Sequence, residues 1–108
     1  MALHRMSLAM YTLMIINQVM GQPGCIGDYG LLVAPPCWDY VKLRNAKSPP
    51  SEECCISYRQ ANIPCVCKSI GDQEEQNIST KRIAYIAAYC GTPLAPGTQC
   101  GSYTVPNA

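Results

Sequence analysis

The sequence predicts a small all-α domain of four short helices, held together by four disulfides and followed by an extended C-terminal arm. Three observations support this fold class: eight cysteines, apolar residues at helical spacing, and no strand-length alternation of apolar and polar residues. The chain has 108 residues, which suits one domain.

The N-terminal segment has the layout of a secretory signal peptide. His4 and Arg5 precede an uncharged apolar run, and all five methionines lie in the first twenty positions. We place the cleavage after Gly21, which makes residues 1–21 the signal peptide and residues 22–108 the domain. A membrane anchor is the alternative, but Asn17 and Gln18 interrupt the run before the roughly 18 apolar residues that a span requires.

All eight cysteines follow the predicted cleavage site, where the oxidising route favours disulfides. Zinc is the competing use of clustered cysteines, but the predicted domain has no His and no paired C-x₂-C motifs. We therefore expect four disulfides and no metal or other cofactor. The bridges would compensate for a thin core that lacks Phe, at about 2–4 kcal/mol each.

The first two helices are predicted from capping and proline signals. Asp28 is expected to cap a helix over residues 29–43, which Pro35 and Pro36 must kink or split. Ser51 is expected to start a second helix that ends near Ala61, with two acidic residues in its first turn.

The third predicted helix covers residues 64–70. Asn62 or Ile63 is expected to lie at its start, and Gly71 is expected to close it. Residues 71–77 are expected to form a polar loop. The fourth helix is predicted between the cap Ser79 and the stop Gly91, with Ile78 and Ile83 as a hydrophobic staple. Residues 92–108 are too rich in Pro and Gly for a regular element and are expected to cross the helices as an arm.

The order of the cysteines indicates a cross-linking role. Adjacent residues on a helix differ by about 100° in direction, so Cys54 and Cys55 must bridge to different neighbours. Cys65 and Cys67 differ by about 200° and likewise face nearly opposite sides.

The full pattern resembles the eight-cysteine motif of the plant non-specific lipid-transfer proteins and the wider prolamin superfamily, which includes seed storage albumins and α-amylase/trypsin inhibitors. The resemblance rests on the order of the cysteines, on PCWDY at 36–40 and on YCGTPL at 89–94. The nine residues between Cys55 and Cys65 are similar to the type 2 and defence-signalling branches. The resemblance implies a right-handed helical bundle around an apolar cavity.

The resemblance also implies a disulfide pairing, namely Cys37 with Cys54 and Cys55 with Cys90. The apolar Val66 favours the type 2-like arrangement for the other four, Cys25–Cys65 and Cys67–Cys100. The alternative arrangement, Cys25–Cys67 and Cys65–Cys100, stays open, because sequence alone does not fix connectivity.

The function that the resemblance implies is the carriage of fatty acyl chains or lysophospholipids by a secreted monomer of the apoplast or cell wall, in plant defence or cuticle lipid transport, with transient membrane contact. The expected lining consists of inward aliphatic residues and one tyrosine: Leu31, Leu32, Val33, Val41, Ile56, Ile63, Val66, Ile70, Ile83, Ile86, Leu94, Tyr103 and Val105. Periodicity alone would assign the same residues to an ordinary core.

Other functions are less consistent with the sequence. The predicted domain has seven basic and seven acidic residues, so a nucleic-acid partner is not expected. It lacks His, and its cysteines are expected to be oxidised, so we do not expect an enzyme. The main alternative is a protease or α-amylase inhibitor that acts through a polar loop. Asn77 lies in a sequon and is a candidate glycosylation site.

Overall fold

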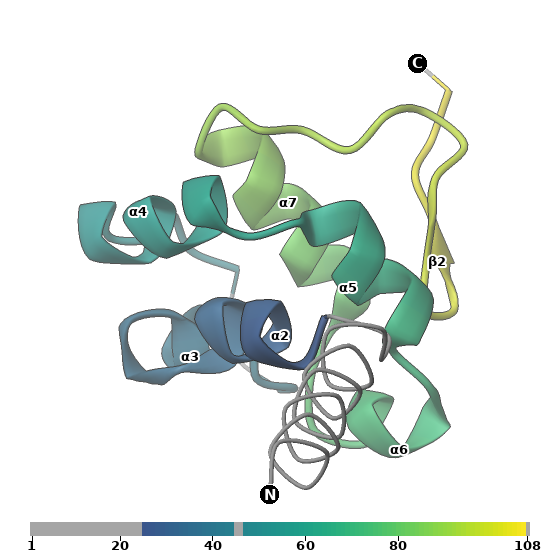
Figure 1. Cartoon of the computed structure of the whole chain (residues 1–108), viewed down its shortest axis with the longest axis horizontal. Helices are drawn as coiled ribbons and strands as arrows, with labels where there is room; N and C mark the ends of the chain where they lie inside the picture. Colours follow the sequence, from purple (N-terminus) through teal and green to yellow (C-terminus); the bar gives the residue numbers. More distant parts are fainter. Residues whose placement is uncertain (1–24, 45–46, 108) are drawn as a thin grey trace, which may run out of the picture.

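The computed structural model describes residues 25–44 and 47–107, so the predicted signal peptide lies outside the described residues. Within these ranges the chain forms helices and one small hairpin (Figure 1). The helices are α2 (Ile26–Val33), α3 (Pro35–Val41), α4 (Glu52–Gln60), α5 (Ile63–Ser69), α6 (Asp72–Glu75) and α7 (Thr80–Tyr89); the strands are β1 (Gln99–Cys100) and β2 (Tyr103–Thr104). The predicted all-α, disulfide-stapled fold class is confirmed.

The first predicted helix is split in two, and it begins earlier than expected. Ala34 has an extended conformation with ψ 167°, as the residue before a proline prefers, and Pro35 opens α3. The prediction of Asp28 as the cap is wrong, because α2 starts at Ile26 directly after Cys25. Asp28 lies in the first turn of α2, where an acidic side chain still suits the helix dipole.

The predicted starts at Ser51 and Ser79 are confirmed, and of the two positions left open for the third helix, Asn62 is the cap. The side chains of Ser51, Asn62 and Ser79 each accept a hydrogen bond of 3.2 Å from the backbone N–H three residues later. Gly91 follows α7 with φ 86°, a left-handed conformation that allows the chain to leave the helix. These signals are local, which explains why the sequence predicts them.

Two elements differ from the expectation. The polar segment after α5 contains one helical turn, α6, in which Glu74 Oε1 accepts a hydrogen bond of 2.7 Å from the N–H of Gly71. The arm contains an antiparallel hairpin in which Gln99 pairs with Thr104 and Cys100 with Tyr103. From the end of α7 the arm passes over the helices and then runs down beside α5 (Figure 1).

Four disulfides connect these elements, and all eight cysteines take part. The pairs are Cys25–Cys65 between α2 and α5, Cys37–Cys54 between α3 and α4, Cys55–Cys90 between α4 and the end of α7, and Cys67–Cys100 between α5 and β1. This is the type 2-like pairing that the resemblance implies. Each of α4 and α5 therefore carries two bridges to two different elements.

Candidate functional site

The interior of the domain is aliphatic. Of the residues expected to line a cavity, eight are buried in one core cluster: Leu32, Val41, Ile63, Val66, Ile70, Ile83, Ile86 and Leu94. They come from α2, α3, α5, α7 and the arm, so the core is shared by segments that the disulfides hold together. Outside this cluster, Thr80 is the only residue with a polar side chain that is buried in the part of the chain that the structure describes.

The centre of this core is closely packed. Leu32, Val41, Val66, Ile83 and Ile86 each have an exposed fraction of 0%. No space as wide as a water molecule therefore adjoins these side chains, and they pack against their neighbours. Any apolar ligand that reaches them must displace some of them.

The other expected lining residues lie nearer the surface. Leu31, Val33, Tyr103 and Val105 are half-buried. Ile56 is 47% exposed, so its assignment to an inward lining is wrong. The inward face of α4 is occupied by Cys54, Cys55 and Tyr58, which leaves Ile56 on the solvent side of the helix.

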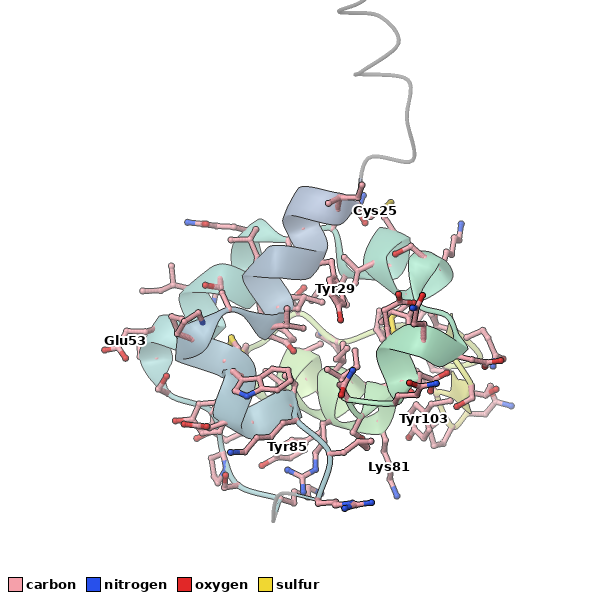
Figure 2. All side chains as sticks on the ribbon, turned by 90° about the horizontal axis from the view of Figure 1, so that it is seen from below. Cys25, Tyr29, Glu53, Lys81, Tyr85 and Tyr103 are labelled. Carbon is pink, nitrogen blue, oxygen red and sulfur yellow. A yellow bond between two sulfur atoms is a disulfide. The ribbon has the colours of Figure 1, made fainter. Side chains whose placement is uncertain are left out.

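An open pocket of about 260 Å³ lies between the start of α2, the end of α5 and α6. It is lined by Cys25, Ile26, Tyr29, Ser69, Ile70 and Glu74. Cys25, directly before α2, and Tyr29 on α2 border the pocket and are labelled in Figure 2. Among the expected lining residues only Ile70 contributes to this pocket. Three separate segments meet there, and no sequence signal predicts such a meeting.

The pocket wall is mainly apolar, with a few polar groups. Partial burial raises the pKa of Tyr29, and the negative charge of Glu74 raises it further. The Ser69 hydroxyl donates a hydrogen bond of 2.8 Å to the carbonyl oxygen of Val66. No basic side chain is among the described lining residues. A ligand here would meet hydrogen-bonding groups and one carboxylate at its polar end.

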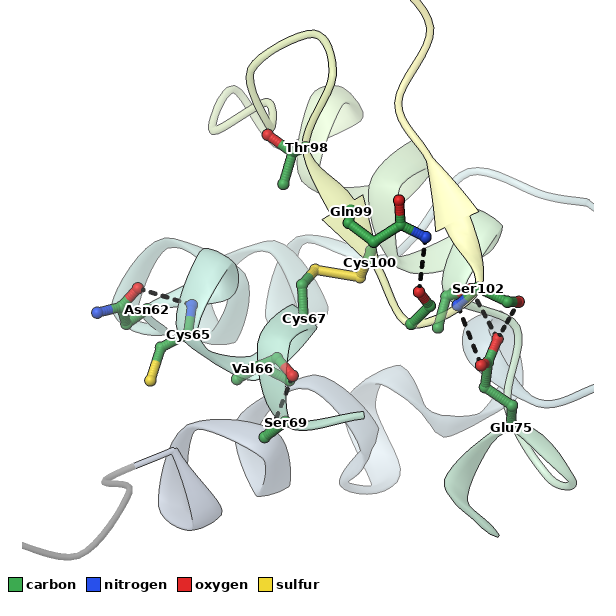
Figure 3. The surroundings of a disulfide bond; sticks show 12 residues. Asn62, Cys65, Val66, Cys67, Ser69, Glu75, Thr98, Gln99, Cys100 and Ser102 are labelled. Atoms are coloured by element: carbon green, nitrogen blue, oxygen red, sulfur yellow. Dashed lines mark hydrogen bonds between the residues drawn. A yellow bond between two sulfur atoms is a disulfide. The ribbon is translucent and has the colours of Figure 1, made fainter. Parts of the chain in front are cut away.

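A second polar feature fixes the arm beside α6 (Figure 3). The Glu75 carboxylate accepts hydrogen bonds from the Ser102 N–H at 3.1 Å, the Ser102 hydroxyl at 2.7 Å and the Thr80 hydroxyl at 3.2 Å. The N–H of Gly101 donates to the carbonyl oxygen of Cys67 at 3.2 Å, next to the Cys67–Cys100 disulfide. These bonds hold the hairpin against the helices.

The core also contains one unexpected polar atom. Tyr58 is fully buried on α4, and its hydroxyl has no hydrogen-bond partner among residues 25–44 and 47–107. Desolvation by burial raises the pKa of this phenol far above its ordinary value.

The described part of the chain holds no group of three or more His, Cys, Asp or Glu side chains suited to a metal ion. None of its helices has the length and apolar character of a membrane span. The sequon residue Asn77 is exposed, and its backbone carbonyl accepts a hydrogen bond of 3.0 Å from the N–H of Leu43.

Taken together, a helical shell with four disulfides, an aliphatic interior and an adjoining apolar pocket defines a small protein suited to an apolar ligand. A family model described as probable lipid transfer matches residues 5–100. The chain therefore belongs to this lipid-transfer family, whose description names transfer of lipid and no chemical reaction. No curated protein and no solved structure gives a significant match to the chain.

Proposed function

We propose that the protein is a secreted carrier that binds the acyl chain of a fatty acid or lysophospholipid. The observation that carries this proposal is the position of Ile70. This residue belongs to the buried core cluster and also lines the open pocket. An alkyl chain that enters the pocket would therefore contact the aliphatic core directly, in a chain that belongs to a lipid-transfer family.

The energetics of binding favour a flexible apolar ligand. Each methylene removed from water contributes about 0.8 kcal/mol, part of which is offset by ordering of the ligand. The pocket volume of about 260 Å³ is slightly below the roughly 300–1,000 Å³ of typical small-molecule sites. A long chain would therefore extend inward by displacing core side chains, while the disulfides keep the helices connected.

The inner contacts of such a chain would come from the aliphatic residues around Ile70. Ile63 and Val66 lie on α5, just before Ile70, and Leu32 on α2 is buried in the same cluster; Cys25–Cys65 bridges α2 to α5. At the pocket, the Tyr29 and Ser69 hydroxyls can hydrogen-bond a head group. We expect weak head-group selectivity, because the pocket offers few polar groups.

Secretion is part of this proposal. It is supported by the predicted signal peptide and by four disulfides, which persist in oxidising compartments. A role in plant defence or in cuticle lipid transport in the apoplast follows from the resemblance of the cysteine pattern. Action as a monomer is likewise proposed.

Native mass spectrometry of the oxidised protein with palmitate and lysophosphatidylcholine tests the proposal. We expect lipid adducts at micromolar protein and lipid concentrations. Absence of adducts, together with tight complexes with trypsin or α-amylase, would overturn the carrier and support an inhibitor.

A pair of neighbouring substitutions tests the place of binding. Ser69 lines the pocket, whereas Lys68 is exposed and is not a lining residue. Ser69→Trp should obstruct the pocket and lower the affinity for palmitate by about tenfold, since an obstructed chain loses one or two methylene contacts. Lys68→Trp should leave the affinity unchanged. Equal binding by both variants would show that the acyl chain enters elsewhere.

A further inference from the structure

The charges of the domain are balanced in number but not in position. Seven basic and seven acidic residues follow Cys25 in the sequence. In the folded chain, a backbone pairing brings two basic segments together. Lys42 forms an antiparallel bridge with Ile78, and the N–H of Ser79 donates to the carbonyl oxygen of Val41 at 2.9 Å. Residues 42–44 therefore lie beside the residues that lead into α7.

Contacts of Lys47 extend this arrangement along α7. Its Nζ lies 4.3 Å from the centroid of the Tyr85 ring. Lys81 is one helical turn before Tyr85, and Tyr89 is one turn after it, with the two tyrosine ring centroids 6.2 Å apart. Figure 2 shows Lys81 and Tyr85 at the same edge of the molecule. Lys47 and Lys81 therefore both lie next to Tyr85, which in turn lies next to Tyr89.

Arg44 belongs to the same region, because the N–H of the adjacent Leu43 donates a hydrogen bond of 3.0 Å to the carbonyl oxygen of Asn77, just before α7. It precedes Lys47 by three residues, so the two Cα atoms are at most about 11 Å apart. We define the basic aromatic face as Leu43, Arg44, Lys47, Lys81, Tyr85 and Tyr89.

The carboxylates that the structure describes form no ion pair with the cations of this face. Among the described residues, no carboxylate lies within salt-bridge distance of Arg44, Lys47 or Lys81. The nearby carboxylate of Asp39 pairs with Lys42 at 3.3 Å, and that of Glu75 is bonded to Ser102 and Thr80. The face therefore carries a local positive charge in a domain whose net charge is near zero.

The same face exposes apolar surface. Leu43 is 39% exposed and Tyr89 is 56% exposed. A soluble polyanion would use the cations but gain little from these two side chains. At the surface of an anionic bilayer, Lys and Arg meet the head groups while Tyr and Leu enter the boundary with the acyl chains.

We propose that the basic aromatic face docks on anionic lipid bilayers. The inference concerns a surface distinct from the pocket and does not depend on which lipid the interior holds. Glu74 lies at the pocket, so that region is less suited to an anionic membrane than the basic aromatic face.

Partitioning of the full, oxidised protein into sedimented vesicles tests this inference. We expect binding to phosphatidylcholine vesicles that contain phosphatidylglycerol, weaker binding to pure phosphatidylcholine, and a decline with added salt. Lys81→Gln should lower the partition coefficient about fivefold, since one basic residue is removed from the surface. Lys68→Gln is the matched control on α5 and should change it much less.

A second pair of variants tests the apolar contribution. Tyr89→Ser should weaken partitioning several-fold, whereas Ile56→Ser, which alters an exposed apolar residue of α4, should not. The inference would be overturned if the protein showed no preference for anionic vesicles, or if Lys81→Gln and Lys68→Gln lowered the partition coefficient equally. It would also be overturned if Tyr89→Ser left vesicle partitioning unchanged and the protein bound polygalacturonate as well as it binds anionic vesicles. The last result would assign the face to a soluble polyanion.

Discussion

The guanidinium of Arg59 joins the ends of two helices: its Nε donates a hydrogen bond of 3.1 Å to the carbonyl oxygen of Cys90. Cys90 terminates α7 and is bridged to Cys55 on α4, so the side-chain contact and the disulfide link the same two elements. A cation at this position also interacts favourably with the negative end of the α7 dipole. The same guanidinium contacts Glu52 Oε1 through Nη1 at 2.9 Å.

Arg59→Ala should therefore destabilise the domain. We expect a loss of about 1 kcal/mol in the free energy of unfolding, because a carbonyl at a helix end loses its charged donor. Guanidinium denaturation of the oxidised protein measures this change. Lys68→Ala, which removes an exposed cation that makes no salt bridge among the described residues, is the control. An equal effect of the two variants would contradict the role of the Cys90 contact.

The ion pair between Arg59 and Glu52 should make the stability of the domain depend on pH in the acid range. The hydrogen bond from Arg59, and then its charge, lower the pKa of Glu52. A carboxyl whose pKa is lower in the folded state contributes stability above its unfolded pKa of about 4.3 and loses it as the pH falls through the folded value. Glu52→Gln should therefore show a smaller loss of stability between neutral pH and acid than the parent. Glu53→Gln, one residue away on the exposed side of α4 and outside the ion pair with Arg59, is the control.

The unpaired hydroxyl of Tyr58 gives a different test. Tyr58→Phe removes a buried polar atom without a partner among the described residues and should be neutral or slightly stabilising. Tyr58→Ala should instead cost about 3–5 kcal/mol through the cavity that it leaves. Thermal and denaturant unfolding of the two variants distinguish these effects. A clear destabilisation by Tyr58→Phe would show that the hydroxyl is hydrogen-bonded.

Tyr58 should also make the parent protein sensitive to alkali. Burial raises the pKa of this phenol. The contribution of Tyr58 to the free energy of unfolding is therefore complete below the unfolded pKa of about 10 and is lost as the pH rises beyond that value. Tyr58→Phe should reduce the alkaline loss of stability. The comparison uses unfolding midpoints at neutral pH and above pH 10, as that is where an exposed phenol ionises.

Substitution of two glycines in the arm distinguishes the cost of backbone strain from the cost of steric crowding. Gly101 and Gly97 both have positive φ, 54° and 84°. A Cβ at Gly101 would lie 2.8 Å from Thr80 Cγ2 and 2.9 Å from Glu75 Oε2, whereas at Gly97 the nearest atom is 3.9 Å away. Both substitutions to Ala should cost about 1 kcal/mol from the left-handed conformation. Gly101→Ala should cost more, because the Glu75 contacts must shift. Similar unfolding midpoints for the two variants would contradict this close approach.

The sequence predicts those parts of the fold that depend on neighbouring residues. Ser51, Asn62 and Ser79 cap their helices because a cap bonds a backbone N–H three residues away. The break at Ala34 follows from the proline after it. Asp28 carried a similar capping signal, but the N-cap of α2 is the disulfide-bonded Cys25 and the helix starts at Ile26.

The candidate site was less predictable, because it depends on contacts between distant segments. The residues expected to line a cavity carry the same apolar pattern whether they form a wall or a filled core, and five of them have no exposed surface. The pocket combines Tyr29, Ser69 and Glu74, which no local pattern connects. The pairing of Lys42 with Ile78, which brings residues 42–44 beside the start of α7, has no sequence signature either.

The order in which the disulfides overlap along the chain has a consequence for proteolysis. The bridge Cys25–Cys65 spans the first half of the domain, Cys55–Cys90 overlaps it, and Cys67–Cys100 extends to the arm. Every peptide bond between Cys25 and Cys100 is thus enclosed by at least one covalent loop. A protease that hydrolyses a single bond, for example after Lys47, leaves both fragments attached, and the nicked molecule comes apart only after a reductant acts.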